Sequence, residues 1–185
     1  MTLSCDEAWA ALRDADLICS AEQVSQAVER VASEIAAALA ETNPLVLSVM
    51  GGAVVFTGQL LTRLRFPLDF DYLHISRYAD KMRGGRIEWK VFPRCPLAGR
   101  TVLVVDDILD EGLTMSEIRD RVLAAGATRF YCAVFADKTI GRAKPIAPDF
   151  VGLSLPDRYV FGFGMDVRGA WRNLPEIYAL KEGSV

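Results

Sequence analysis

Four acidic residues gather at one point of the sequence, directly after a run of apolar residues. The run 102–105 contains only valine and leucine, which is typical of a buried strand in a parallel sheet. Asp106 and Asp107 follow it, and Asp110 and Glu111 come next, before a helical pattern begins. Carboxylates this close repel one another unless a ligand or cation compensates their charge. Because parallel sheets bind ligands beyond the carboxyl ends of their strands, we expect this loop to bind hydroxyl groups, a metal ion or phosphate.

Strands and helices alternate along the chain on both sides of this loop. A helix is predicted to begin after Ser20, which forms a capping box with Gln23, and to end before Asn43. Hydrophobic periodicity predicts strands at 45–50, 68–75, 86–91, 102–106, 130–136 and 159–163, and further helices at about 53–64 and 114–125. The polar segment 76–85 is expected to be a mobile loop.

This alternation implies an α/β fold with a mainly parallel, twisted sheet flanked by helices. We expect a single domain over residues 1–185, with a core at about 40–165. The segments 1–40 and 165–185 are expected to form a small cap over the edge of the sheet.

The composition is that of an ordinary soluble enzyme, with 51% hydrophobic residues, 24% charged residues and a net charge of −3. A nucleic-acid-binding protein would be expected to carry a basic surplus, so no nucleic-acid partner is predicted. No apolar run reaches the length of a membrane span. The acids among the first twenty residues argue against a signal peptide, and the 4 widely spaced cysteines are most simply reduced thiols. These features predict a cytoplasmic protein.

The order of residue types from 101 to 114 resembles the phosphoribosyl pyrophosphate (PRPP) loop of the type I phosphoribosyltransferases. In both, an apolar strand precedes two acids, two apolar residues, an aspartate, one further residue, glycine, one further residue and threonine. The resemblance implies that the two acids bind the ribose hydroxyls, and that backbone N–H groups at the helix N-terminus bind the 5′-phosphate. The implied PRPP- and nucleotide-binding residues are Asp106, Asp107, Ile108, Leu109, Asp110, Glu111, Gly112, Leu113 and Thr114.

The other motifs are similar to those of one branch of this family, the hypoxanthine-guanine phosphoribosyltransferases. The resemblance gives Asp110 the role of general base, which removes the N7 proton of the purine as N9 attacks the ribose. The alternative for this loop is a plain turn in which Asp110 only caps the helix. One cap needs one acid, whereas the loop has four. This chain has two aspartates where the branch commonly has Glu-Asp, which keeps the charge.

Met50, Gly51 and Gly52 occupy the place of the family's pyrophosphate-binding loop, in which lysine is common where this chain has Met50. Arg172 matches an arginine that contacts the diphosphate. Ser76 and Tyr78 resemble the start of the family's flexible lid, which excludes water from the reaction. The alternatives are a plain strand-to-helix turn for the first segment and a solvated hairpin tip for the last.

The resemblance places the purine against four residues in the second half of the chain. Lys138 would hydrogen-bond the 6-oxo group and so disfavour adenine. Tyr159 would stack on the base, the backbone of Val160 would contact N1 and the 2-position, and Asp166 would bind a magnesium ion. The alternatives are a surface lysine and an aromatic core strand. His74, the only histidine, is expected to be structural.

The resemblance therefore implies an enzyme that converts PRPP and hypoxanthine or guanine to IMP or GMP and pyrophosphate, with Mg²⁺ as cofactor. Family members form dimers and tetramers, so a homodimer or homotetramer is expected by analogy. Two alternatives remain open. One is a PRPP-loop regulatory protein that binds nucleic acid, which the pI of about 5.3 disfavours. The other is a phosphoribosyltransferase for xanthine or another base.

Overall fold

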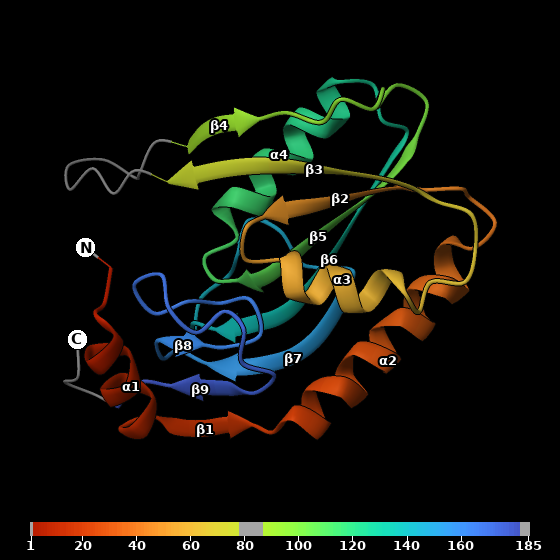
Figure 1. The fold of residues 1–185 in the computed structure, drawn as a ribbon. Helices are drawn as coiled ribbons and strands as arrows, with labels where there is room; N and C mark the ends of the chain where they lie inside the picture. The colour runs from red at the N-terminus through yellow and green to blue at the C-terminus, as the bar shows by residue number, and fades with distance from the viewer. Residues whose placement is uncertain (1, 78–86, 182–185) are drawn as a thin grey trace.

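The computed structural model describes residues 2–77 and 87–181, and most of its strands lie in one sheet. This sheet consists of β2 (Leu45–Met50), β3 (Asp69–Arg77), β4 (Ile87–Val91), β5 (Thr101–Leu109), β6 (Arg129–Thr139) and β7 (Phe150–Pro156). The strand order is β4-β3-β2-β5-β6-β7 (Figure 1). Only the β3–β4 pair is antiparallel. The predicted α/β fold with a mainly parallel sheet is confirmed.

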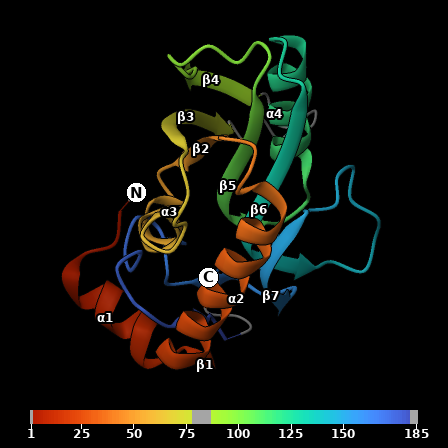
Figure 2. The same cartoon turned by 90° about the vertical axis from the view of Figure 1, so that its right-hand side faces the viewer.

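Helices cover the two faces of this sheet, because successive residues of its buried strands point to opposite sides. In β5, Leu103 and Val105 pack in a cluster with α2 (Ala21–Leu39) and α3 (Val54–Leu61). Val102 and Val104 pack in a second cluster with α4 (Leu113–Ala124) on the other face. Figure 2 shows α2 and α4 on either side of the sheet.

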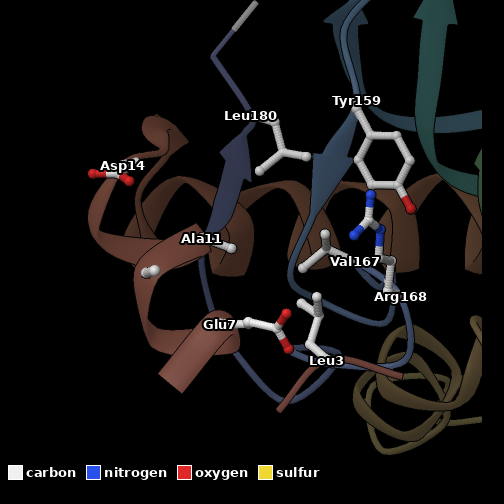
Figure 3. A pocket seen from close by; sticks show the side chains of 9 residues that line it. Leu3, Glu7, Ala11, Asp14, Tyr159, Val167, Arg168 and Leu180 are labelled. Carbon is white, nitrogen blue, oxygen red and sulfur yellow. The ribbon is translucent and has the colours of Figure 1, made fainter. Parts of the chain in front are cut away.

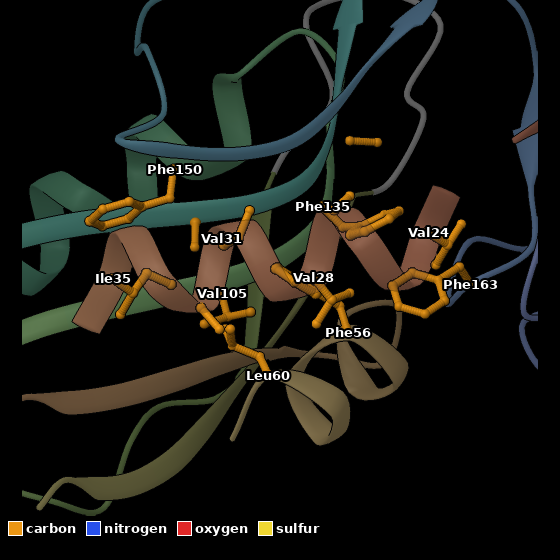
Figure 4. Packing of buried hydrophobic residues seen from close by; sticks show 14 of the residues in the cluster. Val24, Val28, Val31, Ile35, Phe56, Leu60, Val105, Phe135, Phe150 and Phe163 are labelled. Carbon is orange, nitrogen blue, oxygen red and sulfur yellow. The ribbon is translucent and has the colours of Figure 1, made fainter. Parts of the chain in front are cut away.

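The larger cluster fixes α2 against the sheet (Figure 4). The helix begins at the predicted capping box, in which Ser20 N–H donates to Gln23 Oε1 at 2.8 Å. Its buried face meets Phe56 of α3 and Phe135 of β6, whose ring centroids lie 5.3 Å apart. Full burial of a side chain of this size contributes about 1.5–3 kcal/mol to folding. This packing fixes the position of β5, the strand that leads into the acidic loop.

A smaller antiparallel sheet brings the two ends of the described chain together. It consists of β1 (Asp16–Cys19), β9 (Ile177–Ala179) and β8 (Val160–Phe161), in that order. The first helix, α1 (Cys5–Arg13), lies beside it, and Trp171 Nε1 donates to the carbonyl oxygen of Ala8 at 2.7 Å. Helix α2, which the predicted cap included, packs on the main sheet instead.

The structure also differs from the prediction in the last third of the chain. Strand β7 was not predicted, because Pro145 and Pro148 precede it. The predicted strand 159–163 is reduced to β8, since Gly162, Phe163 and Gly164 have φ angles of 98°, 50° and 102° that leave the extended conformation. None of the helices in residues 2–77 and 87–181 has both the length and the apolar character that a membrane crossing requires.

Candidate active site

The acidic loop opens into a cavity of about 330 Å³ at the carboxyl ends of the central strands. Because β2 and β5 are parallel neighbours, the loops that follow them meet at this edge of the sheet. The walls of the cavity come from residues 49–52, residues 106–115, Ile75, Asp166 and Arg172. The structure thus gathers the predicted PRPP loop, the predicted pyrophosphate loop and two C-terminal residues around one space. Ile75 was not among the predicted site residues.

The two adjacent aspartates form an electrostatically unfavourable pair in the wall of this cavity. Asp107 N–H donates to Asp106 Oδ1 at 2.9 Å, and Ile108 N–H donates to Asp107 Oδ1 at 2.9 Å. Burial, with the charge of Asp107 beside it, raises the pKa of Asp106 well above its ordinary value. Burial also raises the pKa of Asp107, although hydrogen bonds and the Arg172 charge oppose the shift. A ligand whose hydroxyl groups donate hydrogen bonds to these carboxylates would stabilise their charged form.

Two glycines let three loops approach one another next to this pair. A Cβ atom on Gly52 would lie 2.0 Å from Asp107 Oδ2, and one on Gly164 would lie 2.1 Å from the Gly52 carbonyl oxygen. Gly164 also has φ of 102°, which disfavours any side chain. Only glycine therefore fits at position 164, and any side chain at position 52 would displace the Asp107 carboxylate. Gly52 was predicted to belong to the site, whereas Gly164 was not; the glycines alternating with aromatic residues at 161–164 were the available signal.

The start of α4 provides the donors expected for a phosphate. Gly112 precedes the helix with φ of 78°, in the left-handed conformation. No side chain caps the helix there. Ser116 N–H donates to the Gly112 carbonyl oxygen at 3.0 Å, which is the first backbone hydrogen bond of the helix. The N–H groups before it point out of the helix N-terminus into the cavity region, where an anion is stabilised. Thr114 lies in this first turn and lines the cavity.

Asp110 lines the cavity, and the Lys138 side chain lies next to it, in the wall of a neighbouring cavity of about 400 Å³. The Lys138 Nζ lies 3.4 Å from Asp110 Oδ2 and 3.9 Å from Asp157 Oδ1. Lys138 belongs to β6 and its side chain is only 13% exposed, so it is not the surface lysine of the alternative interpretation. The two residues together present an acceptor beside a donor.

Asp166 and Arg172 form another part of the cavity wall. Their side chains make an ion pair, Arg172 Nη1 donates to the Gly164 carbonyl oxygen at 2.6 Å, and Gly169 N–H donates to Asp166 Oδ2 at 2.6 Å. Within the described ranges, no group of three or more histidine, cysteine, aspartate or glutamate side chains is arranged to hold a metal ion by itself.

Other predicted residues lie outside this cavity. Tyr159 lines a second cavity of about 280 Å³ beside α1 (Figure 3), and its hydroxyl donates to the Asp166 carbonyl oxygen at 3.1 Å. Val160 is buried and pairs with Ala179 in the small sheet. Ser76 Oγ donates to Glu88 Oε2 at 3.4 Å on the β3–β4 pair, and Tyr78 lies outside the described residues.

In the predicted pyrophosphate loop, the Met50–Gly51 peptide bond is cis.

Comparison with known proteins agrees with this geometry. Residues 15–168 match the family described as the phosphoribosyl transferase domain. The chain is 30% identical to the hypoxanthine-guanine phosphoribosyltransferase of Bacillus subtilis over 166 residues, which cover 89% of this chain and 92% of the relative. It is 32% identical to the hypoxanthine-guanine-xanthine phosphoribosyltransferase of Tritrichomonas foetus, with coverage of 87% and 88%.

Solved structures give the same result. A hypoxanthine-guanine-xanthine phosphoribosyltransferase superposes with a TM-score of 0.84 and 30% identity, over 92% of this chain and 99% of the other. A hypoxanthine-guanine phosphoribosyltransferase of Bacillus anthracis superposes with a TM-score of 0.84 and 26% identity, over 90% and 98%.

Proposed function

The chain belongs to the phosphoribosyltransferase family, and on that premise we propose that it is a purine-salvage enzyme that acts on 6-oxopurines. It takes hypoxanthine or guanine together with PRPP and releases IMP or GMP and pyrophosphate. The bond from purine N9 to the ribose C1 forms, and the bond from C1 to the diphosphate oxygen breaks. The base loses its N7 proton in the same process, so the proton needs an acceptor.

One observation carries the assignment to 6-oxopurines: the Asp110 carboxylate in the cavity wall lies 3.4 Å from the ammonium group of Lys138. The purine edge that bears N7–H and O6 presents a donor beside an acceptor. Asp110 and Lys138 are complementary to that edge, with Asp110 accepting the N7 proton and Lys138 donating to O6. Adenine would place its 6-amino donor against the Lys138 donor, and such mismatches are strongly rejected.

The rest of the cavity suits PRPP. The hydroxyl groups of the ribose would donate hydrogen bonds to Asp106 and Asp107. These bonds would stabilise the two carboxylate charges, which burial destabilises. The 5′-phosphate would accept from the backbone at the start of α4, behind Gly112. The diphosphate would lie between the loop at 50–52 and Arg172, where Met50 supplies no charge.

We expect Mg²⁺ as cofactor. In phosphate chemistry this ion is usually held by one or two protein carboxylates together with the substrate's own oxygens and water. The site fits that pattern, because Asp166 lies in the cavity wall while the described residues form no complete metal cluster. When bound, the ion would neutralise the leaving diphosphate. Arg172, paired with Asp166, supplies a second positive charge from the chain itself.

The surroundings of the site suggest further properties. Tyr159 would stack on the base from the edge of the second cavity, next to the backbone of Val160. The segment that begins at Ser76 would act as a lid against water. A dimer or tetramer in the cytoplasm remains our expectation, and a solved relative from Trypanosoma cruzi is described in terms of its oligomeric state. A nucleic-acid regulator is not favoured by the relatives.

A substrate panel tests the proposal. The purified chain is incubated with PRPP, Mg²⁺ and hypoxanthine, guanine, xanthine, adenine or uracil, and nucleotides are separated by chromatography. We expect IMP and GMP, and no product once a chelator removes the metal. Xanthine is the second candidate substrate, since it appears in the name of the Tritrichomonas relative. Formation of AMP or a pyrimidine nucleotide, without IMP or GMP, would contradict the proposal.

A further inference from the structure

A largely buried lysine lies beside Asp110 and Lys138. Lys144 comes from the β6–β7 loop, residues 140–149, and its side chain is only 12% exposed. Its Nζ donates to the Leu109 carbonyl oxygen at 2.7 Å and to Asp137 Oδ1 at 2.6 Å. Removing an ammonium group from water costs free energy unless it gains such partners. The contacts therefore place Lys144 in one defined position.

The two partners of Lys144 are the residues that immediately precede Asp110 and Lys138. Leu109 is the last residue of β5 and is followed by Asp110, while Asp137 is followed by Lys138. Leu109 and Asp137 are also the last residues of β5 and β6 that face each other in the ladder. Lys144 thus joins the two strands at their final rung, one residue before Asp110 and Lys138.

The loop that carries Lys144 is itself anchored. Ile146 is buried in the same cluster as Leu109, under α4. A Cβ atom on Gly112 would lie 3.3 Å from Lys144 Cβ and 3.4 Å from Pro145 Cδ, so the loop packs directly on the start of α4. This packing holds the backbone of the lysine, and its ammonium group donates to both strands.

We propose that Lys144 is a positioning residue, which holds Asp110 and Lys138 at the separation that a 6-oxopurine requires. This inference rests on the proposed function. Ladder ends fray where the hydrogen bonds stop, and Asp110 lies past the end of β5 with its side chain 52% exposed. Without the bridge, the carboxylate and the ammonium would sample a wider range of separations. A misplacement near 1 Å in an active site can cost about 100-fold in rate.

The test compares Lys144→Met, which keeps the length of the stem, with Lys144→Arg, which keeps the charge. We expect Lys144→Met to lower kcat with hypoxanthine by about 10- to 100-fold, and Lys144→Arg to restore most of it. Lys90→Met, at an exposed lysine on β4, is the matched control and should keep wild-type activity. Full activity of Lys144→Met would overturn the proposal.

A double-mutant cycle separates positioning from plain stabilisation. If Lys144 acts through Asp110, Lys144→Met should lower kcat by no more than about 3-fold when Asp110→Asn is already present, because residues that act as a unit are not additive. If Lys144→Met lowered kcat by the same factor of about 10- to 100-fold in wild type and in Asp110→Asn, the positioning role would be refuted.

Amide hydrogen exchange tests the Lys144 contacts without any substrate. If the wild-type chain makes no nucleotide from any base, the proposed function fails, and exchange at residues 106–113 in the ligand-free protein still tests the bridge. Faster amide exchange in Lys144→Met than in Lys90→Met supports the bridge between the strand ends, whereas equal rates overturn it.

Discussion

Replacing Asp106 by asparagine should make the ligand-free protein more stable while it weakens PRPP binding. Asparagine has the same shape and keeps the Oδ1 atom that accepts from Asp107 N–H at 2.9 Å. It removes a charge that burial and the neighbouring Asp107 both disfavour. Among the described residues, no cation forms an ion pair with Asp106. Relief of such an uncompensated charge is worth about 1–2 kcal/mol in the free energy of unfolding at pH 7.

The effect must depend on pH in one direction. The folded protein raises the pKa of Asp106 above its ordinary value of 3.8, so the folded state holds this proton more tightly than the unfolded state. The cost of the charge is therefore absent below pH 3.8, grows as the pH rises from 3.8 towards the folded-state pKa, and is constant above that pKa. The advantage of Asp106→Asn should be small near pH 4 and larger at neutral pH.

Urea unfolding followed by circular dichroism measures this difference at several pH values. For a chain of this length, about 1–2 kcal/mol corresponds to a rise of about 2–8 °C in Tm. Calorimetry with PRPP should show weaker binding, because one acceptor for the ribose hydroxyls has lost its charge. Asp120→Asn, whose side chain is 62% exposed, is the control and should shift stability by less than about 0.5 kcal/mol. A variant less stable than wild type at pH 7, or an advantage equal at pH 4 and pH 7, would refute the electrostatic reasoning.

Three further substitutions test the roles assigned to the site. Asp110→Asn should lower kcat by about 10²–10⁴ in initial-rate assays with the fold intact, and unchanged turnover would remove Asp110 as the base. Lys138→Met should reduce the preference for hypoxanthine over adenine, measured as a ratio of kcat/KM values, by at least about 100-fold; an unchanged ratio would exclude Lys138 from base recognition. Gly164→Ala should cost at least about 2 kcal/mol in urea unfolding, because its Cβ would lie 2.1 Å from the Gly52 carbonyl oxygen. Gly58→Ala, in α3 with open space around it, should instead stabilise by about 0.5–1 kcal/mol, and equal effects would contradict this argument.

The sequence by itself determined the acidic loop, the fold class and the family. The apolar run 102–105, the spacing of Asp106, Asp107 and Asp110, and the start of a helix all lie within about a dozen consecutive residues. Alternation of apolar and polar residues and helix capping depend on near neighbours along the chain. The strands on either side of the loop, and the capping box at Ser20, could therefore be predicted without knowledge of the fold.

Only the tertiary structure decided which distant residues complete the site. Gly164 belongs to it because it contacts Gly52, and Lys144 does because it reaches Leu109 and Asp137. Strand β7 forms next to β6 although Pro145 and Pro148 precede it. In each case the partner is remote or lies across a turn, and the contact depends on how loops pack. Local periodicity does not reveal such contacts, because they join residues that are far apart in the sequence or lie in loops.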